Sequence, residues 1–377
     1  MPWSTPTVSD CRTALIHAVR TAGRTVTQAC REFGVSRKTA YKWLARHAAD
    51  PTAPPADRSR RPHTSPTRTP ADTEAAVLAA RDQFGWGPRK IVAYLRDRGQ
   101  PAPPVRTPAA VLRRHHRARP AAPPPVPPQR FEWPAPNDLW QVDFKGLVWV
   151  GRRKVFPLTV LDDHSRHLLA ADPCTDQTMA TAWAVLWRVF GEVGLPAAVL
   201  CDNAFGTHNP GIPTVSWFDA QLLRLGVRPI HGRAYHPQTQ GKVERFHGTL
   251  VREVWPTTRR DALGHFAADL ARWRAEVYNP VRPHEAVGDR PPAARWRASP
   301  RPRPAAVPAV EYPAGAVVRK VTPTGDITWH CARILVGRGL VGEWVRVEEA
   351  DGDVVARYGD HPVRRVPVAT LGSGGML

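Results

Sequence analysis

The alternation of apolar and polar residues is most regular in the middle of the chain. Residues 139–172 alternate closely enough to predict a hairpin or a meander of two or three strands. A period of two places Trp140 and Val142 on one face of the first strand and Gln141 and Asp143 on the other. Strands disfavour aspartate, and an unpaired buried charge is costly, so Asp143 needs a specific role.

Helical and apolar segments then follow one another along the chain. Residues 178–194 carry an apolar stripe at helical spacing, and a short apolar strand, AAVLC, leads directly to Asp202. Apolar strands between helices are typical of a buried, partly parallel sheet, whose carboxyl ends tend to form ligand sites. We therefore expect Asp202 at such an edge.

A further helix (216–226) and strand (227–231) precede a basic loop, GRAYHPQTQGK, and a helix that carries Glu244 in its first turn. Val243, Phe246 and Leu250 form the apolar stripe of that helix. Glu244 lies just off this stripe, so it can lean over the sheet.

The N-terminal part of the chain predicts a helix-turn-helix. Thr25 and Gln28 form a capping box for a short helix from Gln28 to Phe33, Gly34 supplies the turn, and Ser36 caps a second helix. In this arrangement the second helix enters the major groove of DNA. The side chains that would face DNA are Arg37, Lys38, Thr39 and Lys42. The alternative is a small helical bundle with a solvated basic face.

Two further regions show weaker patterns. Residues 72–118 combine a turn around Trp86 with a helix opened by Thr107 and Pro108, which predicts a second helix-turn-helix or a purely structural helical hairpin. The region from 310 to 370 contains closely spaced short strands and a hairpin turn at Asp351, which suggest a small β-barrel.

Composition and charge narrow the class of protein. The chain has 377 residues, enough for several domains, and 53 basic against 33 acidic residues give it a net charge of +20. The first 130 residues hold 23 of the basic and 8 of the acidic groups. Nucleic acid is therefore the first partner to consider. The 41 prolines cluster near 51–70, 120–136 and 291–308, which we interpret as linkers.

The chain shows no secretory or membrane pattern. Its N-terminus lacks a basic segment followed by an apolar one, and no apolar run approaches the length of a membrane span. The five cysteines are scattered, so we expect reduced thiols rather than a disulfide framework or a cysteine zinc site. These features predict a protein of the cytoplasm with no membrane partner.

Asp143, Asp202 and Glu244 can converge although they lie far apart in the sequence. Three carboxylates from two strands and a helix suit hard divalent cations with oxygen ligands. A pair of such ions clamps an in-line phosphoryl displacement, which is the chemistry of cutting and joining DNA.

The same residues resemble a known family. WQVDF, CDN and HPQTQGKVERFHGTL, with YNPVRPHEA downstream, are similar to the catalytic core of DDE-type insertion-sequence transposases, which are related to retroviral integrases. The resemblance implies a ribonuclease-H-like α/β fold with a mixed five-stranded sheet flanked by helices. It also implies that Asp143, Asp202 and Glu244 bind two Mg²⁺ or Mn²⁺ ions, with Asp143 bridging both.

The chain departs from the family pattern in two places. The interval between Asp202 and Glu244 is long, which suggests an insertion (THNPGIPTVS), and Ala204 stands where a glycine is usual. Neither change removes a carboxylate.

Other polar residues of the core have simpler interpretations. Asp162 and Asp163 precede a tight turn and favour turn geometry. His236 and His247 have no metal-binding spacing with a cysteine. Near Glu244 a basic group would contact phosphates, or else form a solvated basic loop; it comprises Arg233, Lys242 and Arg245.

The leading hypothesis is a transposase that binds mobile-element ends and target DNA, cuts and rejoins DNA, and works as a homo-oligomer in a bacterial-type cell, associated with the nucleoid. A DNA-binding regulator derived from a transposase would be expected to lose a carboxylate, and all three are present. A nuclease without strand transfer fits the basic head poorly.

The domains that we expect are a helix-turn-helix DNA-binding domain (8–49), a linker (50–71), a second helix-turn-helix-like domain (72–118), a proline-rich linker (119–136), an integrase catalytic core (137–290), a linker (291–309) and a small β-barrel domain (310–370).

Overall fold

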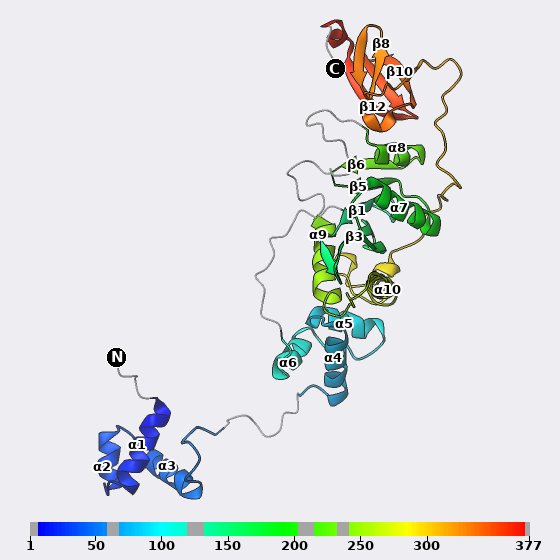
Figure 1. Cartoon of the computed structure of the whole chain (residues 1–377). Coiled ribbons are helices and arrows are strands. Elements are labelled where there is room, and N and C mark those ends of the chain that lie inside the picture. Colours follow the sequence, from blue (N-terminus) through cyan, green and yellow to red (C-terminus); the bar gives the residue numbers. More distant parts are fainter. Residues whose placement is uncertain (1–6, 59–67, 119–131, 203–214, 232–240, 374–377) are drawn as a thin grey trace. The chain divides into compact units, whose positions relative to one another are not determined.

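The computed structural model describes residues 7–58, 68–118, 132–202, 215–231 and 241–373 (Figure 1). The chain divides into two compact units, residues 1–68 and 69–377. Arg233, His236, Ala204 and most of the inserted segment lie outside the described residues.

The first unit is a three-helix cluster around Leu15, Cys30 and Ala40. Its helices are α1 (Val8–Arg20), α2 (Val26–Glu32) and α3 (Arg37–Ala49). The predicted capping box of Thr25 is present, although α2 begins two residues earlier than expected, and Ser36 caps α3. Gly34 has a φ of +61°, as the predicted turn requires.

The second unit opens with three helices around a shared apolar core. They are α4 (Ala71–Phe84), α5 (Pro88–Asp97) and α6 (Arg106–Arg114). Ile91 and Leu95 are fully buried in this core, and Phe84 stacks on Trp86 across the left-handed Gly85.

A mixed sheet forms the centre of the second unit. Its strands are β1 (Trp140–Phe144), β2 (Val148–Val150), β3 (Arg153–Asp162), β4 (Leu168–Cys174), β5 (Ala198–Cys201) and β6 (Arg228–His231). β1, β5 and β6 are parallel neighbours, while β3 is antiparallel to β1 and to β4. This is the mixed α/β arrangement that the apolar strands predicted.

Among the described residues the sheet contains six strand segments, one more than the five strands expected. Phe144 of β1 pairs with Leu158, and Val148 of β2 pairs with Val155, so both strands pair with β3. Between them the register shifts by one residue around the left-handed Gly146. β2 is thus a continuation of β1 after an irregular segment, and the alternation pattern alone does not show this break.

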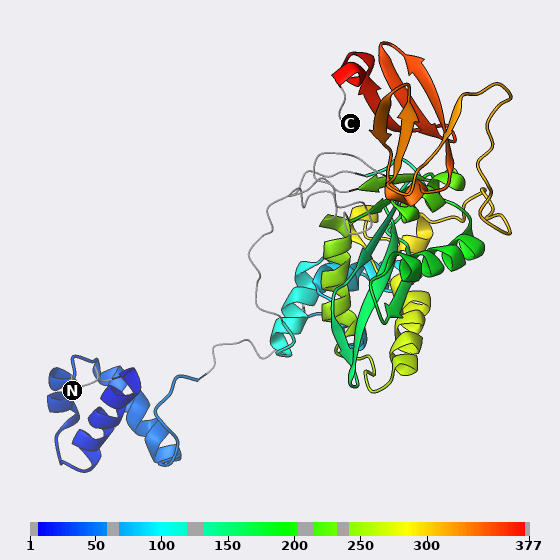
Figure 2. The ribbon, with the colours of Figure 1, turned by 45° about the horizontal axis from the view of Figure 1, so that its top comes forward.

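Helices cover both faces of the sheet (Figure 2). They are α7 (Met179–Val193), α8 (Trp217–Arg224), α9 (Gly241–Thr249) with its π-helical extension η3 (Leu250–Val254), and α10 (Leu263–Trp273) with η4 (Arg274–Tyr278). Residues of α7 and α8 pack on Trp140 and Val142. Residues of α9 and α10 pack on the opposite face, where Gln141 and Asp143 point. None of the helices in the described ranges is long and apolar enough to cross a membrane.

The C-terminal region is built of antiparallel strands. They are β7 (Val318–Lys320), β8 (Asp326–Trp329), β9 (Ala332–Leu335), β10 (Trp344–Ala350), β11 (Asp353–Tyr358) and β12 (His361–Pro367). Short helical turns are η5 (Glu285–Val287), η6 (Pro292–Ala294), η7 (Arg338–Leu340) and η8 (Val368–Ser373). The predicted hairpin turn joins β10 to β11, with Asp351 and Gly352 both at positive φ.

The closed barrel that the sequence suggested is not present among the described residues. Strands β12, β11, β10 and β7 form one open sheet, and β8 pairs with β9 alone. Both groups share one apolar core, which also includes Val215 and Ala220 next to and within α8. A side chain at Gly339 would collide with the backbone of Ser216, so this packing requires glycine.

Candidate active site

The sheet register brings Asp143 and Asp202 together. β1 and β5 run parallel, with Gln141 opposite Leu200 and Val142 opposite Cys201. The next residues along the two strands are Asp143 and Asp202, so they leave the sheet side by side and on the same face. Asp202 directly follows β5, at the edge where it was expected, and Asp143 lies within β1.

Helix α9 brings the third carboxylate to this face. Val243, Phe246 and Leu250 are buried, as the apolar stripe predicted, and Glu244 in the first turn is exposed. The helix packs against β1, on which Asp143 lies. Glu244 therefore stands beside its stripe, at the end of the helix closest to the preceding basic loop.

The three carboxylates form one electrostatic site. Burial raises the pKa of Asp143 to about 7, and repulsion by Asp202 and then by Glu244 adds to this effect. Like charges act on a pKa mainly over short distances, so Asp202 and Glu244 both lie close enough to Asp143 to oppose its charge.

The chemistry of these donors fits hard divalent cations, because carboxylate oxygens are their preferred ligands and a cation would relieve the mutual repulsion. Among the residues that the structure describes, however, no group of three or more His, Cys, Asp or Glu side chains is arranged to hold a metal ion. Asp202 and Glu244 thus act on the charge of Asp143, but the described side chains do not form a preorganised metal-coordination site.

Thr159 and His247 are neighbours of Asp143 in the folded chain. Thr159 is opposite Asp143 in the β1–β3 pairing and donates its hydroxyl to the Asp143 carbonyl at 3.0 Å. His247 Nε2 lies 2.9 Å from Thr159 Oγ1, and its Nδ1 lies 3.7 Å from Asp143 Oδ2. Burial and the nearby Lys145 lower the pKa of His247 to about 4, so the ring is neutral.

Sequence reasoning considered His247 only as a metal ligand and missed this contact. Its position three residues after Glu244, on the same helix, was the available signal.

A second histidine supports Asp202. His231 lies beside Cys201 in the β5–β6 pairing, and its Nε2 is 2.9 Å from Asp219 Oδ1 on α8. Burial opposes the charge of His231, but the hydrogen bond and charge of Asp219, together with Asp202, outweigh burial and raise the pKa of His231. Periodicity could not have found this contact, because it depends on how helix α8 packs against strand β6.

The turn between β3 and β4 uses its two aspartates differently. Asp162 Oδ1 accepts the Ser165 backbone N–H at 2.7 Å, which is the turn role that the sequence predicted. Both aspartates are fully buried, but the Asp163 carboxylate lies 2.5 Å from the ammonium of Lys242. Asp163 is therefore paired with a residue outside the turn, which the sequence did not predict.

The predicted DNA-contacting residues occupy two places. On α3, Arg37, Lys38 and Lys42 are exposed and Thr39 is half-buried. On α9, Arg245 is exposed, while Lys242 is half-buried against Asp163. Their assignment to DNA stays a prediction.

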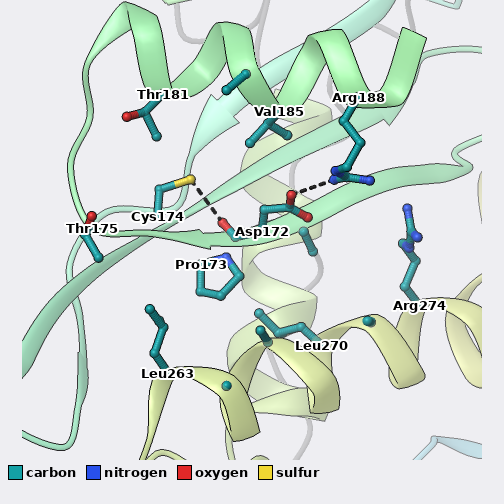
Figure 3. Close-up of a pocket in the computed structure, with 15 residues that line it drawn as sticks. Asp172, Pro173, Cys174, Thr175, Thr181, Val185, Arg188, Leu263, Leu270 and Arg274 are labelled. Atoms are coloured by element: carbon teal, nitrogen blue, oxygen red, sulfur yellow. Dashed lines mark hydrogen bonds and ion pairs between the residues drawn. The ribbon is translucent and has the colours of Figure 1, made fainter. Parts of the chain in front are cut away.

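Figure 3 shows a separate pocket of about 780 Å³ between β4, α7 and α10. Arg188 pairs with Asp172 at 2.5 Å, and Arg274 also lines the pocket. Burial raises the pKa of the Cys174 thiol there to about 11, which disfavours thiolate chemistry. None of the three coupled carboxylates is among the residues that line it.

Family models match the central part of the second unit. Two models described as "Integrase core domain" match residues 134–237 and 225–292, the region of the sheet and of the three carboxylates. A third, "leucine-zipper of insertion element IS481", matches residues 8–82.

Two curated relatives come from insertion elements. The "Insertion element IS476 uncharacterized 39.2 kDa protein" of Xanthomonas euvesicatoria is 29% identical over 166 residues, 42% of this chain and 44% of the relative. The "Insertion element IS407 uncharacterized 31.7 kDa protein" of Burkholderia multivorans is 29% identical over 174 residues, 44% of this chain and 58% of the relative. The chain thus spans about half the length of the curated relatives that it matches.

Among solved structures, the HTLV-2 integrase catalytic core domain in complex with magnesium aligns with 43% of this chain and 97% of its own, with a TM-score of 0.31 and 16% identity. The resemblance noted in the sequence is confirmed by the family models and the insertion-element relatives: residues 134–292 of the chain match the integrase core domain.

Proposed function

We propose that this protein is an insertion-sequence transposase that cuts DNA at element ends and joins the freed ends to target DNA. The observation that carries the proposal is the parallel β1–β5 register, which sets Asp143 beside Asp202 on the face covered by the helix of Glu244. Integrase core models match this same region.

Asp143, Asp202 and Glu244 are the residues that would hold two Mg²⁺ or Mn²⁺ ions. Such ions, when bound, activate the attacking oxygen and stabilise the leaving oxygen of an in-line displacement. The carboxylates supply the negative charge that draws the ions in. Thr159 fixes the backbone of Asp143, and the neutral His247 adds no competing positive charge.

The reaction conserves bonds at each step. In cleavage, water attacks a phosphodiester at the element end, the bond from phosphorus to the 3′-oxygen breaks, and that oxygen leaves as a 3′-hydroxyl. In strand transfer, the same hydroxyl attacks a target phosphodiester, so one P–O bond forms as another breaks. No external reductant, oxidant or energy source is required.

DNA would approach along basic surfaces. The net charge of +20 favours a polyanionic partner, and the exposed Arg37, Lys38 and Lys42 on α3 are suited to one end of the element. Arg245 next to Glu244 would contact a phosphate near the site. We include Thr39, Arg233 and Lys242 among the proposed contacts, as the sequence suggested.

Two element ends must be processed together, so a homo-oligomer is part of the proposal. A transposase acting on the DNA of a bacterial-type cell would work at the nucleoid, in the cytoplasm.

An end-cleavage and strand-transfer assay tests the proposal. The substrate is DNA from the flanks of the coding region, with Mg²⁺ or Mn²⁺, and the proteins are wild type, Asp143→Asn, Asp202→Asn and Glu244→Gln. Each variant should lose at least about 100-fold in rate, because even outer partners of metal ligands can cost that much. Glu276→Gln, an exposed substitution on η4, serves as control. Variants as active as wild type would refute the site. DNA binding without any cleavage by wild type would favour the regulator derived from a transposase.

A further inference from the structure

Asp163 is a fully buried carboxylate with a complete set of partners. It accepts hydrogen bonds from Gln141 Nε2 at 2.7 Å and from the Trp133 backbone N–H at 2.9 Å, and Lys242 Nζ lies 2.5 Å from its Oδ1. An ionised carboxylate in a protein interior is costly unless it is paired and hydrogen-bonded. Arg166 is the other nearby cation, but it is 3.8 Å away and also pairs with Glu132. Lys242 is thus the closest compensating charge.

These contacts join the two elements that carry the proposed active site. Gln141 lies on β1, two residues before Asp143 and on the same face. Lys242 lies on α9, two residues before Glu244. Through one buried carboxylate, the strand of the first carboxylate is therefore linked to the helix of the third.

An apolar stripe does not by itself determine where a helix sits along a sheet. Val243, Phe246 and Leu250 would remain buried after a small rotation or slide of α9. Apolar contacts are non-directional, whereas a buried polar pair is satisfied in only one register. The Lys242–Asp163 pair therefore supplies directional information that the stripe lacks.

A second polar contact fixes α9 farther along. His247 on α9 reaches Thr159, which in turn bonds to the backbone of Asp143. Lys242 and His247 are separated by about one and a half helical turns, and Glu244 lies between them. Two directional contacts on either side of Glu244 determine both the rotation and the axial position of the helix.

We infer that Asp163 and Lys242 are positioning residues that hold Glu244 in place over Asp143 and Asp202. This inference rests on the proposed function, because it concerns the site that would hold the metal ions. Lys242 then acts within the protein before any DNA is bound. If Lys242 served only as a phosphate contact, its loss would leave metal binding in the absence of DNA unchanged.

Binding of Mn²⁺ to the full-length protein without DNA provides the test, with free Mn²⁺ measured by electron paramagnetic resonance. The variants are Lys242→Met, Lys242→Arg, Asp163→Asn, the double variant Asp163→Asn/Lys242→Met, and Asp143→Asn. Arg252→Gln is the matched control, because Arg252 is an exposed cation on η3, which continues α9. Urea unfolding of each protein gives the folded fraction, to which binding is normalised.

We expect Lys242→Met and Asp163→Asn each to raise the half-saturating Mn²⁺ concentration by about tenfold or more, as loss of an outer partner of a metal ligand does. Lys242→Arg should stay within about threefold of wild type, since it keeps the charge. In the double variant, the half-saturating Mn²⁺ concentration should rise by less than the product of the two single-variant increases, because no unpaired buried charge remains. Arg252→Gln should match wild type.

Two results would overturn the inference, and they differ in what they imply for the proposed function. If Lys242→Met is less stable than wild type but binds Mn²⁺ equally well per folded molecule, the ion pair is only structural, and the proposed function is unaffected. If wild type and Asp143→Asn bind Mn²⁺ equally, the carboxylates hold no metal, and both the proposed function and the inference are wrong.

Discussion

Asp143 has conflicting requirements for stability and for the proposed chemistry. Its side chain is half-buried on one face of the sheet and is repelled by two other carboxylates, and both conditions disfavour its charge. Metal binding requires the charged form. An acid whose pKa is raised by folding binds its proton more tightly in the folded state than in the unfolded chain. The free energy of unfolding therefore falls as the pH rises from 3.8, the ordinary pKa of aspartate, to about 7.

Replacing this residue should consequently stabilise the metal-free protein. We expect Asp143→Asn to raise the free energy of unfolding by about 2 to 4 kcal/mol at about pH 8, and by little at about pH 4. Urea unfolding at the two pH values measures the difference, and Mg²⁺ should narrow it at pH 8 by stabilising wild type alone. Asp97→Asn, an exposed substitution on α5, should show no such pH dependence. If Asp143→Asn raised the free energy of unfolding equally at both pH values, the charge of Asp143 would not be the cause of the effect.

At the scale of elements, Glu253 joins the helices before the sheet to the helices that follow it. It lies on η3 and binds Arg282 through two hydrogen bonds of 2.8 and 2.9 Å. From α5 and the turn before it, Lys90 Nζ and Trp86 Nε1 also reach this carboxylate, at 2.9 and 3.2 Å. Burial would raise the pKa of Glu253, but Arg282 and Lys90 outweigh it and bring the pKa to about 2.

We expect Glu253→Gln to lower the free energy of unfolding by about 3 kcal/mol near neutral pH, because Arg282 and Lys90 would then face each other without an anion. Burial and Arg282 already lower the pKa of Lys90 to about 8. Keeping Lys90 charged therefore costs free energy, which offsets part of the stabilisation that Glu253 provides. The stabilisation is complete above the unfolded pKa of 4.5 and disappears as the pH falls toward about 2.

Chemical denaturation from pH 7 down to the acid limit of folding measures this effect, with Glu276→Gln as an exposed control on η4. The difference between wild type and Glu253→Gln should shrink with acidification. A constant difference would mean that Glu253 contributes through packing and not through charge.

Local patterns predicted those elements that depend on local chemistry. The capping box of Thr25, the stripe of Val243 and Phe246 and the turn role of Asp162 follow from neighbouring residues, and all three are found. The link between Asp163 and Lys242 could not be predicted, because it joins residues 79 positions apart and depends on tertiary packing.

The same limit applies to larger features. The open C-terminal sheet differs from the expected barrel because strand density reveals the number of strands but not whether the first and last pair. The register shift between β1 and β2 likewise depends on how both strands pair with β3.

At the scale of the whole molecule, charge and chemistry are separated along the chain. The first 130 residues carry 23 basic and 8 acidic groups, whereas the coupled carboxylates all lie beyond residue 140. Under the proposed function, the protein binds DNA mainly through one region and processes it in another. Changes in the N-terminal helices should therefore alter affinity and its salt dependence, and leave metal binding at the carboxylates unaffected.

The last prediction concerns Lys38 and Lys42, which are exposed and one turn apart on α3. If both contact phosphates, Lys38→Ala/Lys42→Ala should weaken DNA binding and reduce the slope of log affinity against log salt by about two, since each lost phosphate contact removes roughly one counterion. Fluorescence anisotropy with element-flank DNA, from about 50 to 200 mM salt, measures the slope. Glu244→Gln in every protein prevents cleavage during the titration. Arg20→Ala, an exposed substitution at the end of α1, controls for loss of charge. An unchanged slope would show that α3 does not bind the DNA backbone, and the helical bundle with a solvated basic face would then be the better interpretation of the first unit.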